Sequence, residues 1–393
     1  MESRRPRRTR EKLLLGPGPS PVEGRVLRAL AEPTLGHLDG DFVALMDETQ
    51  ELLRKTFQTS NALTVTMPGT GSAGMEAACV NVIERGDTVI IGDQGVFGQR
   101  MQDVAERCGA TVIKVSAPFG KTLPEETLFE AIDSHPEAKL VGLVQAETST
   151  GVLQNLDAIA AKVHEAGMLL LVDAVTSLGG MEVPVDRLGL DIVYSGSQKC
   201  LGCPPGLAPL TLSSRAVEVV RSRKTKVQSW YLDLTMIMRY WEQERFYHHT
   251  APVNMLYAFN EALRIVDEEG LESRWARHRR NAEALWAGLE AMGLTLPVAK
   301  EDRLPSLTCL ALPEGIDDGR LRRELMERHA IEVGSGLGEF RGRVIRVGLM
   351  GSGSTANNVL LFLSALAATL RRMGHPVDVA SALERAEERL DGD

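Results

Sequence analysis

The run Leu169-Leu170-Leu171-Val172-Asp173-Ala174 is the stretch of sequence from which the fold can be inferred. Consecutive apolar residues are typical of a strand that is buried on both faces of a parallel sheet, and this run ends in a carboxylate. In parallel α/β sheets, ligands bind beyond the carboxyl ends of the strands, where Asp173 would lie. Because a buried carboxylate is costly without a cation, we expect Asp173 either to face a protonated heterocyclic nitrogen or to cap the helix that follows.

Short apolar strands alternate with helical patterns on both sides of this run. The sequence predicts strands at 61–67, 88–91, 111–115, 140–145, 168–172 and 192–194, and helices at 77–83, 99–108 and 156–164. This alternation is typical of βαβ units. We therefore expect an α/β fold with a mostly parallel sheet and helices on both of its faces.

The sequence pattern changes after about residue 255. It predicts long charged helices at 255–269 and 272–292, strands at 307–312 and 344–349, and a helix at 357–372. We expect these elements to form a smaller α+β domain that a long helix joins to the sheet domain. The charged helix at 383–390 is expected to be a solvated end.

Length, composition and charge exclude several classes of protein. The 393 residues suit two domains, and 44% hydrophobic with 25% charged residues is typical of a globular chain. The longest apolar runs fall short of the roughly 18 residues of a membrane helix, so we expect no membrane partner. Six of the first twelve residues are basic although the net charge is -9. The acidic body is poorly suited to nucleic acid, and we expect the basic tail to be solvated and disordered.

The cysteines indicate a reducing compartment. Five cysteines are too few for a disulfide framework, and the N-terminal residues do not resemble a secretory signal, so we expect a cytoplasmic protein. Cys200 and Cys203 have the spacing of a redox or zinc pair. Zinc would need two further ligands, and the sequence offers no second pair. We therefore expect structural cysteines and no metal site.

A glycine-rich segment, Gly69-Thr70-Gly71-Ser72-Ala73-Gly74, lies between a predicted strand and a predicted helix. It fits the G-x-G-x-x-G pattern, and Asp93 follows nineteen residues after its last glycine, which taken alone indicates a dinucleotide site. The physical basis of this pattern does not specify a dinucleotide, because the exposed N–H groups at a helix N-terminus attract any phosphate. The segment therefore predicts a phosphate site, or else a plain tight turn.

A lysine follows the next predicted strand, in Ser195-Gly196-Ser197-Gln198-Lys199, 26 residues after Asp173. The surrounding loop could bury Lys199 and leave its amine nucleophilic at neutral pH, although a single lysine is more often a surface charge. A phosphate loop, a strand-end aspartate and a lysine suited to Schiff-base formation, in this order, describe a pyridoxal 5'-phosphate site.

Five segments of the sequence resemble those of the fold-type I, class V aminotransferases, most closely the alanine–glyoxylate and serine–pyruvate group. They are residues 14–20, 147–153, 195–199, 247–250 and 346–351, and the resemblance extends from about Leu13 to Leu370. It implies a mostly parallel seven-stranded sheet in a large domain plus a smaller α+β C-terminal domain. The implied divisions are an N-terminal arm at 1–19, a large cofactor-binding domain at 20–262 and a small domain at 263–393.

The same resemblance implies the roles of the site residues. Lys199 and Asp173 would be catalytic, Lys199 as the covalent attachment point and proton carrier, Asp173 as the partner of the ring nitrogen. Arg346 would bind the substrate carboxylate, with Thr148 and Gly18 beside it. The other cofactor-binding residues would be Thr70, Gly71 and Ser72 around the cofactor, Phe97 on its ring, Thr148 near its ring oxygen, and Gln198, Tyr247 and Thr250 at its phosphate. Because Tyr247 and Thr250 come from the neighbouring subunit in this family, a homodimer with shared sites is implied.

The implied activity is transamination of a small L-amino acid, alanine or serine, with glyoxylate or pyruvate by a ping-pong mechanism. Ureidoglycine–glyoxylate aminotransferases are an alternative, because they share the Thr-Ser-Thr-Gly and His-His-Thr elements and have phenylalanine at the position of Phe97. Another class V enzyme such as a cysteine desulfurase, a non-catalytic pyridoxal-phosphate protein and an NAD-dependent oxidoreductase are further alternatives. His248 and His249 are expected to pack and hydrogen-bond rather than to bind a metal.

Overall fold

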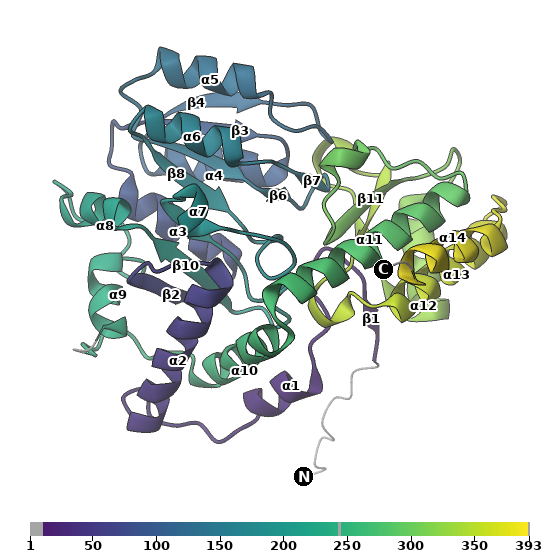
Figure 1. Ribbon diagram of the computed structural model, residues 1–393, viewed down its shortest axis with the longest axis horizontal. Coiled ribbons are helices and arrows are strands. Elements are labelled where there is room, and N and C mark those ends of the chain that lie inside the picture. Colours follow the sequence, from purple (N-terminus) through teal and green to yellow (C-terminus); the bar gives the residue numbers. More distant parts are fainter. Residues whose placement is uncertain (1–10, 243–244, 392–393) are drawn as a thin grey trace, which may run out of the picture.

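A seven-stranded sheet lies at the centre of the larger part of the protein (Figure 1). The computed structural model describes residues 11–242 and 245–391, so the first ten residues of the basic tail lie outside the described range. The strands in order across the sheet are β2 (Leu63–Pro68), β10 (Leu207–Leu212), β9 (Ile192–Tyr194), β8 (Leu169–Asp173), β5 (Leu140–Val144), β3 (Thr88–Asp93) and β4 (Thr111–Ser116). Strand β10 pairs antiparallel with both neighbours and the other pairs are parallel, which confirms the predicted mostly parallel sheet.

Strand β10 is the strand of this sheet that the sequence pattern did not predict. It contains Pro209, which has no N–H group and argues against an internal strand position. The Pro209 carbonyl nevertheless accepts a hydrogen bond from the Ser195 amide at 2.8 Å, and Pro209 lies opposite Thr66 of β2. Antiparallel pairing with both neighbours holds the strand in place despite the missing donor.

Helices pack against both faces of the large sheet (Figure 1). They are α1 (Gly24–Leu30), α2 (Gly40–Phe57), α3 (Gly71–Val82), α4 (Val96–Arg107), α5 (Glu125–Ser134), α6 (Asp157–Glu165), α7 (Val185–Leu188), α8 (Ser214–Arg221), α9 (Leu234–Trp241) and α10 (Val253–Glu269). A hairpin of β6 (Ala146–Glu147) and β7 (Val152–Leu153) follows β5.

A smaller sheet with its own hydrophobic core follows α10. Its strand order is β11 (Leu307–Ala311), β14 (Val344–Gly348) and β13 (Gly334–Ser335), all antiparallel. The helices and turns of this part are α11 (Leu271–Ala291), η1 (Lys300–Asp302), α12 (Asp318–His329), η2 (Gly338–Phe340), η3 (Gly351–Gly353), α13 (Ala356–Arg372) and α14 (Val379–Asp391). The exact domain boundaries, 20–262 and 263–393, stay a prediction.

The N-terminal arm connects the two parts. Strand β1 (Leu13–Leu14) pairs in parallel with β12 (Ile331–Glu332), and Leu15 is fully buried in the smaller core. A few residues later, the Ser20 amide donates to the Gln198 carbonyl at 3.0 Å. The arm therefore runs from a two-stranded sheet beside the smaller core to the loop that follows β9 of the large sheet.

The expectation of a solvated C-terminal helix is correct for its charged residues, which are exposed, but wrong for its opposite face. Helix α14 packs against α11 and α13, with Ala382 and Ala386 fully buried. These alanines are four residues apart and form a narrow face that lies against the opposing helix, where Gly288 approaches the Ala382 carbonyl. The sequence pattern did not predict this face, because small side chains contribute little to a hydrophobic pattern and charged residues lie between the alanines.

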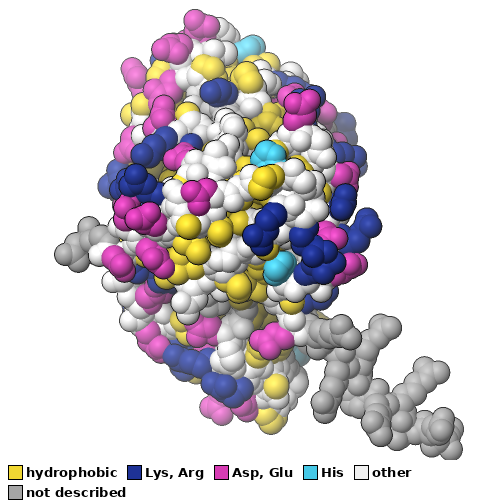
Figure 2. All heavy atoms as spheres, turned by 90° about the vertical axis from the view of Figure 1, so that its right-hand side faces the viewer, with side chains coloured by type: hydrophobic (Ala, Val, Ile, Leu, Met, Phe, Trp, Pro, Cys, Tyr) yellow, Lys and Arg dark blue, Asp and Glu magenta, His cyan; other side chains and the backbone are white. Residues whose placement is uncertain are grey.

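Charged side chains of both signs are intermixed on the face that Figure 2 shows. Within the described residues, no helix has the length and apolar character needed to cross a membrane.

Candidate active site

A cavity of about 230 Å³ lies at the carboxyl ends of the parallel strands and contains most of the predicted site residues. Eight of them line it: Thr70, Gly71, Ser72, Phe97, Thr148, Asp173, Gln198 and Lys199. Met75, Arg100, Val144, Ala146 and Val175 complete the lining. A larger, more open cleft of about 700 Å³ has residues such as Glu125, Arg187 and Arg279 in its wall. No predicted site residue in the described chain lines that cleft, so the smaller cavity is the candidate site.

Asp173 is the last residue of β8 and its carboxylate is buried. It accepts hydrogen bonds from the Tyr194 hydroxyl at 2.7 Å and the Val175 amide at 2.8 Å. Burial raises the pKa of Asp173 to about 6, although these hydrogen bonds and the charge of Lys199 oppose the shift. No helix begins directly after it, since α7 starts at Val185, so the helix-cap alternative is wrong. A cation in the cavity would favour the charged form of Asp173 and offset the cost of burying its carboxylate.

Lys199 lies in the loop after β9, and its amine is almost completely buried. Burial, followed by the charge of Arg346, lowers the pKa of Lys199 to about 8. About a tenth of the amine is therefore neutral and nucleophilic at pH 7, far more than for an ordinary lysine. Its Nζ donates to the Pro17 carbonyl of the N-terminal arm.

Gly18 allows the arm to lie directly over Lys199. A Cβ atom at this position would come within 2.7 Å of the lysine Cδ, and the φ of Gly18 is +101°. Ser20 then fixes the arm, because its hydroxyl donates to the Lys199 carbonyl at 2.7 Å. The family resemblance assigned Gly18 to the substrate carboxylate and did not predict this contact with the lysine.

The glycine-rich segment forms the N-terminus of α3, with Thr70 at the N-cap position. The first amides of a helix have no intrahelical acceptor and can bind an anion, and Gly71 and Ser72 of this first turn line the cavity. Ser72 accepts a hydrogen bond from Arg100 at 3.1 Å, and the Arg100 guanidinium lies 4.8 Å from the centre of the Phe97 ring. Arg100 was not predicted. Its spacing from Phe97, one helical turn along α4, is the signal that could have revealed it.

The residues present fit pyridoxal phosphate. The cavity joins anion donors at α3 and the cation Arg100 to a carboxylate at Asp173 and an amine at Lys199. Gln198 also lines the cavity, where its side-chain NH2 can donate to a phosphate. Gly71 is required at the α3 end, because a Cβ there would come within 2.8 Å of Val175. The site therefore has polar groups that a phosphorylated, nitrogen-containing ring would satisfy.

Glu147 positions Phe97, a role that the sequence analysis did not assign. Its carboxylate accepts from the amides of Phe97 and Gly98 at 3.2 and 3.3 Å, at the start of α4. Ser149 donates to the same carboxylate through its amide and hydroxyl. Burial raises the pKa of Glu147, which is fully enclosed. The spacing of Glu147 and Ser149 alone could not have revealed a contact with residues about 50 positions earlier.

Arg346 comes from the middle strand of the small sheet, β14, and is buried. Its Nε donates to the Ser335 carbonyl at 2.7 Å and its Nη1 to the Thr148 carbonyl at 3.0 Å. These contacts bring the small domain against a residue that lines the cavity. The Thr148 hydroxyl in turn shares a hydrogen bond with Thr176. The structure thus places Arg346 beside the candidate site, from the opposite domain.

Tyr247 and Thr250 are not brought to the cavity of their own chain. Both are exposed, their hydroxyl oxygens are 3.5 Å apart, and neither lines the cavity within the described residues. The neighbouring His248 stacks on Trp230 with ring centres 4.5 Å apart, and its Nδ1 is 2.8 Å from that of His249. These ring and hydrogen-bond contacts agree with the packing role predicted for the two histidines.

A strand-end aspartate, a buried lysine and a helix N-terminus around one cavity are the groups expected at the cofactor site of a pyridoxal-phosphate enzyme. The model of the aminotransferase class-V family matches residues 23–343, and the chain belongs to this family. Class-V aminotransferases depend on pyridoxal phosphate. The glycine-rich segment is therefore part of an aminotransferase and not of a nicotinamide oxidoreductase.

Similar proteins include two kinds of glyoxylate transaminase. The crystal structure of alanine–glyoxylate aminotransferase from Nostoc sp. is 49% identical, with a TM-score of 0.92 over 94% of this chain and 98% of that one. The structure of ureidoglycine–glyoxylate aminotransferase from Bacillus subtilis is 38% identical, with a TM-score of 0.96 over 99% and 100%. The alanine–glyoxylate aminotransferase of Callithrix jacchus is 42% identical over 364 residues, which are 92% of this chain and 88% of the relative.

Proposed function

We propose that this aminotransferase moves the amino group of a small L-amino acid, alanine or serine, to glyoxylate or pyruvate by a ping-pong mechanism. The observation that carries the proposal is the arrangement of three groups. The amine of Lys199 and the carboxylate of Asp173 share one cavity, and the guanidinium of Arg346 reaches its edge from the other domain. Glyoxylate is the acceptor named for all three similar proteins, which supports it here.

Each of these groups has a task that follows from its chemistry. Pyridoxal phosphate supplies an electron sink for the negative charge that develops when the substrate α-carbon loses its proton. Lys199, with its lowered pKa, takes and returns that proton. Asp173 keeps a ring nitrogen protonated through an ion pair in a buried setting. Arg346 binds the substrate carboxylate in a two-point contact that its planar guanidinium favours.

Ureidoglycine is the second candidate amino donor. Phe97 supports it, because phenylalanine at this position is a feature that the sequence shares with ureidoglycine–glyoxylate aminotransferases. A cysteine desulfurase is less well supported, because all five cysteines are buried and Cys309 lies within strand β11. The same free cysteines support a cytoplasmic location.

A matrix of amino donors and oxo-acid acceptors tests the proposal. Purified holoenzyme is incubated with alanine, serine or ureidoglycine and with glyoxylate or pyruvate, and the amino-acid products are quantified. We expect the highest kcat/KM for alanine or serine with glyoxylate. A clear preference for ureidoglycine would favour the second candidate. Absence of turnover with every pair would contradict both.

We also propose a homodimer in which Tyr247 and Thr250 complete the site of the partner subunit. Their exposure and their distance from the cavity of their own chain support this assignment. Mixing an inactive Lys199→Ala chain with an inactive chain that carries Tyr247→Ala and Thr250→Ala tests it. If sites are shared, hybrid dimers have one intact site, and random reassembly restores about a quarter of wild-type activity. Sites built from one subunit would restore none.

A further inference from the structure

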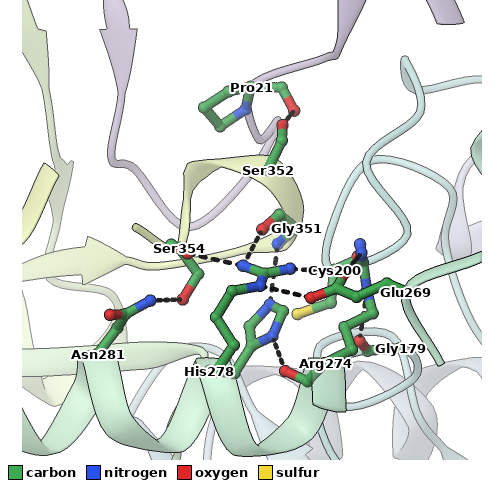
Figure 3. A network of polar contacts seen from close by, with 11 residues as sticks. Pro21, Gly179, Cys200, Glu269, Arg274, His278, Asn281, Gly351, Ser352 and Ser354 are labelled. Carbon is green, nitrogen blue, oxygen red and sulfur yellow. Dashed lines mark hydrogen bonds and ion pairs between the residues drawn. The ribbon is translucent and has the colours of Figure 1, made fainter. Parts of the chain in front are cut away.

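A cluster of charged residues lies where the chain passes from the large domain to the small one (Figure 3). Helix α10 ends at Glu269, and α11 begins at Leu271 after Gly270, whose φ is +78°. The side chains of Arg274 and His278 project from the first turns of α11 toward this junction (Figure 3), and Arg277 on the same helix bonds to Glu269. None of these residues lines the candidate active site among the described residues.

Arg274 binds two loops of the large domain. Its Nε donates to the Gly179 carbonyl at 3.0 Å and its Nη2 to the Cys200 carbonyl at 2.7 Å. The first loop follows Asp173, and the second begins at the residue after Lys199. The side chain of Arg274 is only 3% exposed, so a rigid and fully enclosed guanidinium links the two catalytic segments.

Arg277 binds the small domain instead. Its Nη1 donates to the carbonyls of Gly351 and Ser354 at 3.0 and 2.6 Å, in the turn that follows strand β14. His278 accepts from the Gly351 amide through Nε2 at 3.0 Å. Its Nδ1 lies 2.7 Å from the Arg274 carbonyl, which fixes the tautomer with the proton on Nδ1. Burial lowers the pKa of His278 to about 3, so this residue is neutral and the tautomer is maintained.

Glu269 joins the two arginines. Its Oε2 accepts from Arg274 at 2.5 Å and from Arg277 at 2.9 Å, and its Oε1 accepts from Arg277 at 2.5 Å. Although burial opposes it, hydrogen bonding and the positive charges hold the pKa of Glu269 below its ordinary value. The carboxylate therefore stays charged and offsets the repulsion between two guanidinium groups that serve different domains.

We propose that Glu269, Arg274 and Arg277 form an interdomain clamp. These positioning residues hold the Lys199 segment of the large domain at a fixed distance from Arg346 of the small domain. The clamp rests on the proposed function, since it holds the amine and the carboxylate-binding group at the two ends of one small substrate. A misplacement of about 1 Å between reacting groups can cost about 10²-fold in rate. The clamp thus sets how close the Lys199 amine lies to the α-carbon of an amino acid whose carboxylate Arg346 holds.

Two substitutions and a neighbouring control test the clamp. Glu269→Gln keeps the size of the side chain but removes the charge that joins the arginines. Arg277→Lys keeps the charge but loses the forked contact of Nε and Nη2 with Glu269, and is the milder change. The control is Glu268→Gln, at the residue next to Glu269. It removes an exposed ion pair between Glu268 and Arg25. All variants are studied as holoenzymes with measured cofactor content.

We expect Glu269→Gln to raise the KM for the amino acid about tenfold and to lower kcat/KM about 10²-fold per bound cofactor. Arg277→Lys should show smaller changes in the same direction, and Glu268→Gln none. A purely structural role would lower only the fraction of folded, cofactor-bound protein. Unchanged KM and kcat per bound cofactor in both clamp variants would overturn the proposal.

Hydrogen exchange separates this proposal from the proposed function. In Glu269→Gln, amide exchange should increase together in residues 199–203 and 349–355, which lie in different domains, whereas the control should match wild type. This readout does not depend on which reaction the enzyme catalyses. If wild-type enzyme transaminates none of the tested donors, the proposed function fails and the exchange data alone decide the clamp. Unchanged exchange in both segments would then overturn it.

Discussion

Replacing Lys199 by alanine is expected to abolish transamination while the protein still folds. Among the described residues that line the cavity, Lys199 is the one that carries an amine. Loss of general acid–base catalysis alone corresponds to about 10²–10⁴-fold, and loss of the covalent attachment adds to it. Because burial disfavours the charged amine, its removal should not lower the melting temperature markedly.

Borohydride reduction followed by peptide mass spectrometry checks this prediction. Wild-type protein should carry a pyridoxyl group on the Lys199 peptide, and Lys199→Ala should carry none. The matched control is Lys162→Ala on α6, which removes a lysine paired with Asp133 at 2.6 Å, away from the cavity. A pyridoxyl group on another lysine of the wild type would contradict the assignment.

The pH dependence of cofactor attachment provides a second measurement on Lys199. Its pKa is about 8 in the folded protein against an ordinary value of 10.5, so the neutral amine becomes the major form above about pH 8. The rate at which apoprotein forms the covalent bond should rise with pH up to about 8 and then level off. A rate that still rises steeply between pH 9 and 10 would show an amine without the lowered pKa.

Replacing Asp173 by asparagine is expected to lower kcat/KM by about 10²–10³-fold, the cost of losing one preorganised charge in a buried site. Asparagine keeps the size of the side chain but removes the charge that pairs with the ring nitrogen. Cofactor affinity should also fall, which a fluorescence titration of apoprotein measures. In the wild type this affinity should weaken as pH falls through about 6, where Asp173 takes up a proton, and the variant should lack that step.

The same pKa has a consequence for the apoprotein. The unfolded chain releases the Asp173 proton near its ordinary pKa of 3.8, before the folded chain does at about 6. Stability of the apoprotein should therefore fall as pH rises from 4 to 6, by up to about 3 kcal/mol from this group. Thermal melts across this range measure the effect, and Asp173→Asn should reduce it.

Asp93→Asn is the matched control for Asp173→Asn. Asp93 is also the last residue of a parallel strand, β3, and is half-buried, but it does not line the cavity. Its replacement should leave kcat/KM nearly unchanged. A large loss in Asp93→Asn with little effect in Asp173→Asn would contradict the assignment of the two carboxylates.

The sequence alone determined which chemical groups stand at the strand ends. Period and hydrophobicity placed Asp173 at the end of a buried strand and the glycine-rich segment before a helix, because both signals are local. The order of phosphate loop, aspartate and lysine then indicated the cofactor. Strand β10 was not predicted because Pro209 is untypical of an internal strand. The buried face of α14 was not predicted because alanine adds little to a hydrophobic pattern.

Only the tertiary structure decided which of these groups meet. Arg346 contacts Thr148 across 198 positions of sequence, and Ser20 contacts the Lys199 carbonyl across 179. The roles of Glu147 and of the Glu269 clamp likewise depend on carbonyls and amides of distant loops. The physical reason is that hydrogen bonds require atoms within about 3 Å in defined directions. Local sequence sets each residue's chemistry, whereas domain packing sets these distances.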